Sequence, residues 1–391
     1  MCCCVGTSIT FPAFVWITAS RHTKDPASSW MVPGCISRRR SRQNSQRIFG
    51  TSLMTNLYWI LPLAFVGALV GTAVLRRYAL SNSLIDVPNA RSSHVLPTPR
   101  GGGVAIVVSF LLSAIFLAVT QQIQWSVALA VLVPGGLVAI IGFLDDHGHI
   151  PARWRLLGHF SSAIIGMVIF NGMPAIHLFG MAIDLGWAAY LFGSFYLVWL
   201  LNLYNFMDGI DGLASMEAIF VCLGGAILYI VSGNPGSVWG PVALALAVAG
   251  FLYWNFPPAR IFMGDAGSGF LGITLGFLSL QAAWVNPALF WGWLILLGAF
   301  IVDATCTLFV RLIRGDKVYE AHRSHAYQYA SRQYGSHLPV TLSVTGINVV
   351  WLLPIAILVA IGLLDGLVGL LVAYAPLLVL ALRFKAGQRE V

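Results

Sequence analysis

Apolar runs separated by short polar segments recur along the chain from residue 57 to residue 384. A run of about 17 to 25 apolar residues is the length that an α-helix needs to cross the hydrocarbon core of a bilayer. Eleven such runs are predicted, beginning near Leu57, Gly101, Ser126, Leu156, Trp187, Leu213, Val238, Phe270, Ala288, Val340 and Gly366. The pattern therefore predicts an all-α, polytopic membrane protein of about 10–11 transmembrane helices.

The composition excludes an ordinary soluble domain. The chain has 391 residues, of which 58% are hydrophobic and only 9% are charged, whereas charged residues make up about 25% of a typical soluble domain. We find no internal repeat and no long low-complexity linker. Residues 57–384 are therefore predicted to form one transmembrane domain, and residues 385–391 a cytoplasmic tail.

Basic residues predict the orientation of the helices. With these runs, every Lys and Arg from Arg76 onward lies in alternate connections, and the connections between them carry none. Lys and Arg are retained in cytoplasmic loops, so the basic connections and the C-terminus are predicted to be cytoplasmic. We attribute the net charge of +8 to these basic cytoplasmic connections, so nucleic acid is not expected as a partner.

The first fifty residues conflict with this orientation. They carry seven basic residues on the side that would be translocated, and Met54 stands directly before the first apolar run. Our hypothesis is that residues 1–53 are a mis-assigned upstream extension or a disordered tail. Four of the six cysteines also fall there, while Cys222 and Cys306 lie singly inside apolar runs, so no disulfide or metal-site spacing is present.

Seven of the fourteen carboxylates lie in four polar segments at the predicted cytoplasmic surface. These segments are residues 142–146, 202–212, 262–269, and 316–320, the last of which continues into residues 322–325. Acidic side chains that are gathered at one membrane surface cost free energy and need a counter-ion. Magnesium on oxygen ligands, carrying a phosphorylated substrate, has the required chemistry.

The polar motifs occur in a specific order along the chain: residues 86–94, 97–103, 145–146, 205–211, 264–268 and 322–325. This order resembles the polyprenyl-phosphate N-acetylhexosamine-1-phosphate transferase family (glycosyltransferase family 4) over residues 57 to about 385. Within the family, the chain looks closest to the branch that initiates O-antigen or other surface glycans. Residues 322–328 differ from the triple-histidine motif of the cell-wall branch, phospho-N-acetylmuramoyl-pentapeptide transferase, which stays as the alternative.

The resemblance implies an enzyme of the bacterial cytoplasmic (inner) membrane whose active site faces the cytoplasm. It implies transfer of N-acetylhexosamine 1-phosphate from a UDP-sugar to undecaprenyl phosphate, with release of UMP, as the first membrane step of surface-polysaccharide synthesis. The identity of the hexosamine and the formation of a homodimer stay open. A secondary transporter is the distant alternative, but the acids lie at one interface and no repeat is visible.

The resemblance also assigns the metal and catalytic residues. Asn205 and Asp265 are expected to bind Mg²⁺, with Mn²⁺ as the alternative ion, and Asp208 is expected to be a catalytic carboxylate near the metal. Asp145 and Asp146 are expected beside the acceptor phosphate, one of them as general base. Positioning of the acceptor and metal organisation stay open for this pair, because a phosphate monoester is largely dianionic near neutral pH.

Substrate binding is expected from a second set of residues: Asp211, His322, Arg323, His325, Arg153 and Arg155. The histidines are expected to donate to the nucleotide and the arginines to clamp phosphate. An ordinary role is open for each: a loop contact for Asp211, solvated histidines, and arginines that only set topology. His94 and Arg100 receive no role, and Asp303 is either a packed polar contact or a site residue.

We expect a single displacement in which the acceptor phosphate attacks the sugar-bearing phosphorus in line. A covalent intermediate on Asp208 or Asp145 is the alternative.

Overall fold

The structure is a computed structural model that describes residues 59, 61–88, 96–148, 150–316 and 323–388. All described elements belong to one compact unit within Leu53–Val391. The predicted extension at residues 1–53, and also His94 and His322, lie outside the described residues.

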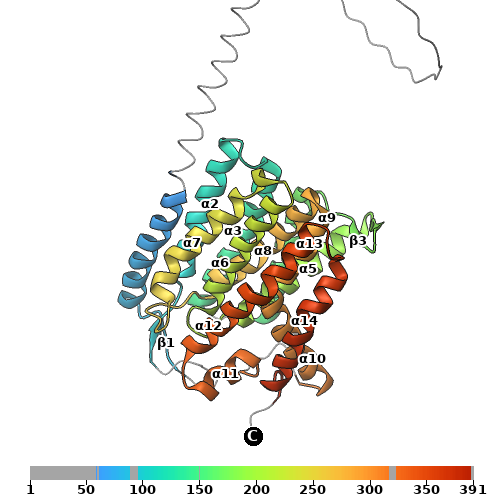
Figure 1. The fold of residues 1–391 in the computed structure, drawn as a ribbon. Helices are drawn as coiled ribbons and strands as arrows, with labels where there is room; N and C mark the ends of the chain where they lie inside the picture. The colour runs from blue at the N-terminus through green and yellow to red at the C-terminus, as the bar shows by residue number, and fades with distance from the viewer. Residues whose placement is uncertain (1–58, 60, 89–95, 149, 317–322, 389–391) are drawn as a thin grey trace, which may run out of the picture. The chain divides into compact units, whose positions relative to one another are not determined.

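Long and short helices that lie side by side form this unit (Figure 1). They are Leu61–Ser81, α2 (Gly103–Val119), α3 (Trp125–His147), α4 (Ala152–Phe170), α5 (Ala188–Met207), α6 (Leu213–Val231), α7 (Trp239–Asn255), α8 (Asp265–Val285), α9 (Pro287–Leu296), α10 (Gly298–Ile313), α11 (Ala326–Tyr334), α12 (His337–Ile347), α13 (Leu353–Ala360) and α14 (Gly366–Arg383).

All eleven predicted apolar runs contain helix, which confirms the all-α membrane fold. Seven described helical segments are long and apolar enough to cross a bilayer, and the shorter α2 is also apolar. The run near Ala288 was predicted as one span, but it is two helices, α9 and α10, bent by 69° at the intervening residue. The run near Val340 is helical throughout, with a π-helical segment η2 (Asn348–Leu352) between α12 and α13.

Helix α8 lies at the centre of the bundle and packs against α2, α3 and α5. Among the seven candidate spans it has the largest buried share, 83% of its apolar window. Glycines permit this close packing: a Cβ added at Gly142 of α3 would lie 2.5 Å from the backbone nitrogen of Ala266, and one at Gly103 of α2 would lie 2.4 Å from the Cα of Gly267. Small residues of this kind let helix backbones approach closely in membranes. They bring the ends of α2 and α3 to the start of α8.

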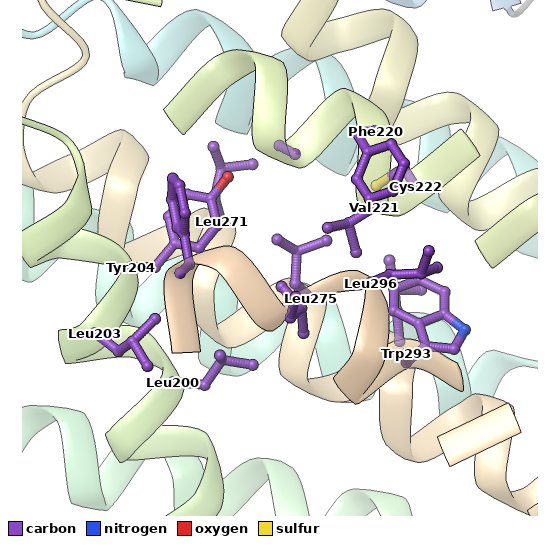
Figure 2. Packing of buried hydrophobic residues seen from close by; sticks show 14 of the residues in the cluster. Leu200, Leu203, Tyr204, Phe220, Val221, Cys222, Leu271, Leu275, Trp293 and Leu296 are labelled. Atoms are coloured by element: carbon purple, nitrogen blue, oxygen red, sulfur yellow. The ribbon is translucent and has the colours of Figure 1, made fainter. Parts of the chain in front are cut away.

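The interior of the bundle is filled by interlocking apolar side chains (Figure 2). Leu271 and Leu275 of α8, Tyr204 of α5 and Trp293 of α9 are buried in one cluster. A Cβ added at Gly225 of α6 would lie 2.4 Å from the Trp293 ring. In lipid, such packing replaces the hydrophobic effect as the force between helices, so the fit of these side chains fixes which helices are neighbours.

Two small antiparallel pairs of strands join the helices. β1 (Ile85–Asp86) pairs with β2 (Thr98–Pro99), directly before α2, and β3 (Ile176–Leu178) pairs with β4 (Met181–Ile183) between α4 and α5. Phe262 donates its N–H to the carbonyl of Pro99, which holds the segment before α8 against β2. At the other end of the chain, residues 385–388 of the predicted tail are packed: the Gly387 N–H donates to the Ser324 carbonyl at 2.7 Å.

Candidate active site

Polar ends of four helices meet at the start of α8. The last turn of α3 carries Asp145 and Asp146, the first turn of α4 carries Arg155, α5 ends at Asp208, and α8 begins with Asp265. Because α3 and α5 run antiparallel to α8 in close packing, their C-terminal ends reach its N-terminus. We call the carboxylates Asp145, Asp146, Asp208, Asp211 and Asp265 the acidic cluster.

Asp146 connects three parts of the site. Its Oδ1 accepts from Arg100 at 3.1 Å (Nε) and 2.5 Å (Nη2), and from the backbone N–H of Asp265 at 3.2 Å. The carboxylate thus caps the start of α8, where unpaired N–H groups favour an anion. Its other oxygen, Oδ2, is buried and has no hydrogen-bond partner among the described residues.

Asp145 has a different set of partners. Its Oδ2 pairs with Nη1 of Arg155, and its Oδ1 accepts from the Ile150 N–H at 2.7 Å. Nη1 of Arg155 also lies 3.3 Å from Oδ2 of Asp265. Asp145 and Arg155 therefore form an ion pair, and because the Asp145 side chain is only 6% exposed, the pair belongs to the site and not to the surface.

The two arginines of α4 differ in position. Arg155 bridges two members of the acidic cluster, whereas the Arg153 guanidinium lies over the ring of Trp154, 5.7 Å from its centroid. The structure thus brings only Arg155 of the predicted pair into contact with the carboxylates.

Asn205 lies beside the first turn of α8. Its Oδ1 accepts from the Ser268 hydroxyl at 2.5 Å, and Ser268 follows Asp265 by three residues. The carboxylate of Asp265 is directed to the site, since its Oδ2 lies 3.3 Å from Nη1 of Arg155. The two predicted metal ligands thus belong to neighbouring elements.

Asp208 is the C-terminal cap residue of α5, half-buried within the acidic cluster. Burial, followed by the negative charges of Asp265 and Asp146, raises the pKa of Asp208 well above its ordinary value. A cation beside these carboxylates would oppose this rise, since an opposite charge favours the ionised form.

The donor atoms of the site suit magnesium, although they do not form a complete cage. Among the described residues, no three His, Cys, Asp or Glu side chains converge to hold a metal ion by themselves. Magnesium commonly binds one or two carboxylates and takes its remaining oxygens from water and substrate phosphates. The oxygens of Asn205 and Asp265, with the unpartnered Oδ2 of Asp146 nearby, fit an ion that arrives with a phosphorylated substrate.

Asp211 is held at its backbone and its side chain. Its Oδ2 accepts from the Ala259 N–H at 3.0 Å, its Oδ1 lies 3.2 Å from Nδ1 of His337, and its carbonyl accepts from Thr341. It also lines a pocket of about 570 Å³ with Phe262, Arg332 and His337. The loop contact that sequence reasoning left open for Asp211 is present, and the same residue lines this pocket.

Asp303 organises the segment that contains His325. Its carboxylate accepts from the backbone N–H groups of Ala326 and Tyr327, both at 3.0 Å, and lies 3.3 Å from Nδ1 of His325. The Tyr327 hydroxyl in turn donates to the Phe206 carbonyl at 2.9 Å. Asp303 is thus a packed polar contact that caps α11, and α11 is anchored to the end of α5.

The remaining predicted substrate residues are not brought to the acidic cluster by any described contact. His325 is buried between Asp303 and the ring of Tyr327. The carbonyl of Arg323 accepts from Arg332, and His322 lies outside the described residues. Their roles stay predictions.

Sequence reasoning gave no role to three residues that the structure places in contact with predicted site residues: Arg100, His337 and Tyr327. Arg100 precedes a run of three glycines, which was a local signal of close backbone approach. His337 and Tyr327 offered no such signal, since their partners lie more than a hundred residues away.

Comparison with known proteins agrees with this arrangement. The family model of glycosyl transferase family 4 matches residues 128–283, the segment from α3 to α8. A probable undecaprenyl-phosphate N-acetylglucosaminyl 1-phosphate transferase of Bacillus subtilis is 27% identical over 271 residues, which cover 68% of this chain and 74% of that relative.

Two further relatives are more identical over shorter segments. Decaprenyl-phosphate N-acetylglucosaminephosphotransferase of Mycobacterium tuberculosis is 34% identical over 54% of this chain and 57% of its own length. Phospho-N-acetylmuramoyl-pentapeptide-transferase of Moorella thermoacetica is 34% identical over 47% of this chain and 61% of its own length. Together with the motifs and the helical fold, these matches support placing the chain in glycosyl transferase family 4, among the polyprenyl-phosphate N-acetylhexosamine-1-phosphate transferases.

Proposed function

We propose that the protein transfers N-acetylhexosamine 1-phosphate from a UDP-sugar to a polyprenyl phosphate and releases UMP. One observation carries this proposal: Asp265, Asp146 and Asn205 meet at the N-terminus of a central helix, beside two arginines. A helix N-terminus, cations and metal-binding oxygens together form a site for phosphate groups.

The acceptor phosphate and the donor diphosphate would both be anchored by this arrangement. Arg155 and Arg100 limit the repulsion between the acidic cluster and incoming phosphates, since both are paired with its carboxylates and each is still about one third exposed. The oxygens of Asn205 and Asp265 would hold Mg²⁺. When bound, the ion neutralises negative charge on the transferring phosphoryl group and on the leaving nucleotide.

In the proposed reaction, an oxygen of the lipid phosphate forms a bond to the phosphorus that carries the sugar. The bond between that phosphorus and the UMP oxygen breaks, and UMP leaves with the electron pair. The lipid phosphate is largely dianionic near neutral pH, so its attack does not require a base. Asp145 and Asp146 would then position Arg155, Arg100 and the start of α8 through the contacts described above.

The pocket of about 570 Å³ beside Asp211 is the proposed place of the nucleotide. It mixes apolar and polar side chains, and it lies at the same end of the bundle because Asp211 follows α5 by four residues. Asp211, Arg332 and His337 offer the mixture of acceptor and donor groups that a nucleotide needs.

The basic connections support an orientation with this end of the bundle in the cytoplasm, where UDP-sugars are made. The Bacillus and mycobacterial relatives are named for N-acetylglucosamine transfer, which supports an N-acetylhexosamine donor and a role at the start of surface-glycan synthesis. The second candidate is transfer of phospho-N-acetylmuramoyl-pentapeptide, since relatives with that name also match.

The test is UMP release by the purified protein with undecaprenyl phosphate and a panel of UDP-N-acetylhexosamines, with and without chelator. UMP release that needs both the lipid phosphate and magnesium supports the proposal. If UDP-N-acetylmuramoyl-pentapeptide is the one donor that supports UMP release, the second candidate is favoured. Movement of a solute across sealed vesicles without any UMP would favour a transporter.

A further inference from the structure

Glu217 is a buried acid that the proposed reaction does not use. It is the fifth residue of α6 and is 1% exposed. It forms no ion pair with any described residue. An unpaired charge inside a membrane-spanning helix is costly, so the protonation state of Glu217 requires an explanation.

The partner of Glu217 is Asn348, the first residue of the π-helical segment η2. Nδ2 of Asn348 donates to Oε2 of Glu217 at 2.5 Å. The remaining oxygens, Oε1 of Glu217 and Oδ1 of Asn348, are both buried and both lack a hydrogen-bond partner among the described residues. The nearby Tyr204 hydroxyl does not serve them, because it donates to the Ala214 carbonyl.

An unsatisfied acceptor on each of two hydrogen-bonded partners indicates a missing proton. A carboxylate has only acceptor sites, whereas a protonated acid also has one O–H donor. A primary amide and a carboxylic acid each carry one donor and one acceptor on adjacent atoms, so they can form two hydrogen bonds with each other. The oxygen and nitrogen of Asn348 are assigned from this network, and exchanging them would require the same proton on Glu217.

We propose that Glu217 carries a proton and forms a neutral acid–amide pair with Asn348, which holds α12 and η2 against α6 and so positions Asp211. The segment that carries Glu217 also contacts α12 at Asp211. Asp211 lies six residues before Glu217, and Thr341 and His337 of α12 bind it at 3.0 and 3.2 Å. The link to turnover rests on the proposed function, in which Asp211 lines the nucleotide pocket.

Infrared spectroscopy tests the proton directly. The C=O stretch of a protonated carboxylic acid is separate from that of a carboxylate, and Glu217→Gln should remove one such band from the spectrum of the full-length protein in detergent. Asp184→Asn is the control, since Asp184 is exposed and contacts only its own loop; it should leave every protonated-acid band in place.

Kinetics and thermal stability test the positioning role. Glu217→Gln should stay within about threefold of wild-type turnover, because two amides can still form the paired hydrogen bonds. Glu217→Met, of similar size, should raise the KM for the UDP-sugar more than it lowers kcat. It should also lower the midpoint of thermal unfolding by several degrees, since it leaves the Asn348 amide buried without a partner. Asn348→Leu should reproduce the effects of Glu217→Met.

Two results would overturn the inference: a set of protonated-acid bands that Glu217→Gln leaves unchanged, or a Glu217→Gln protein as impaired as Glu217→Met. Should the wild-type protein transfer no sugar phosphate, the proposed function would fail. The infrared band and the thermal midpoints would still report whether the pair exists.

Discussion

Substitution of Gly264 by alanine tests the geometry at the start of α8. Gly264 has φ +78° and ψ 170°, a conformation that is essentially restricted to glycine and costs another residue about 1–3 kcal/mol. A Cβ added at Gly264 would lie 2.6 Å from Oδ2 of Asp146, closer than real carbon–oxygen contacts. Either the backbone before Asp265 or the Asp146 carboxylate must move.

The expected loss follows from these contacts. Moving Asp146 weakens its bonds to Arg100 and to the Asp265 N–H, and a hydrogen bond to a charged group contributes about 1.5–3 kcal/mol. The clash can be relieved by a shift of Asp146 or of the backbone before Asp265, and either shift weakens these bonds. A loss of about 3 kcal/mol in transition-state stabilisation corresponds to a decrease of more than a hundredfold in kcat/KM. We therefore expect Gly264→Ala to insert normally and to lose at least two orders of magnitude in UMP release.

Gly136→Ala is the matched control. It adds the same methyl group inside α3, where no atom lies within 4 Å of the new Cβ, and alanine favours a helix by up to about 1 kcal/mol over glycine. The control should keep wild-type turnover and be at least as stable. A correctly inserted Gly264→Ala protein with turnover within threefold of wild type would refute the described role of Gly264.

Three further outcomes are expected. Asp265→Ala should lose at least a hundredfold in turnover, and added Mg²⁺ should no longer stimulate it; full turnover of this variant in chelator would contradict the metal assignment. Arg155→Met should lower turnover at least tenfold, because it leaves Asp145 buried without its cation. Arg153→Met should keep turnover within about threefold of wild type, and equal losses in the two variants would contradict their difference in position. Since the raised pKa of Asp208 favours its protonated form, the metal-free protein should lose stability as the pH rises above 3.8, by at most about 1.4 kcal/mol per pH unit. Thermal unfolding in chelator should show this slope, Asp208→Asn should flatten it, and an unchanged slope in that variant would assign the effect to another group.

The fold class could be predicted because it depends on local properties of the chain. The length and apolarity of each run are readable without knowledge of its neighbours, and every predicted run contains helix. The bend between α9 and α10 could not be predicted in this way, since the apolar run continues through it. Its consequence is tertiary: α10 carries Asp303 to the start of α11.

The candidate site was predictable in its residue types but not in its pairings. The motif order indicated Asp145, Asp146, Asn205 and Asp265, and the structure brings all four to the start of α8. Their assignment to metal and catalysis stays a prediction.

The sequence by itself determined which segments form apolar helices and which segments carry acids, because apolarity and charge are properties of each segment alone. Only the tertiary structure decided that Arg100 pairs with Asp146, that Arg155 and not Arg153 reaches the carboxylates, and that Glu217 meets Asn348. The physical reason is that these pairs join separate helices. Which helices touch depends on the fit of glycines and large side chains around α8, and that fit exists only in the folded chain.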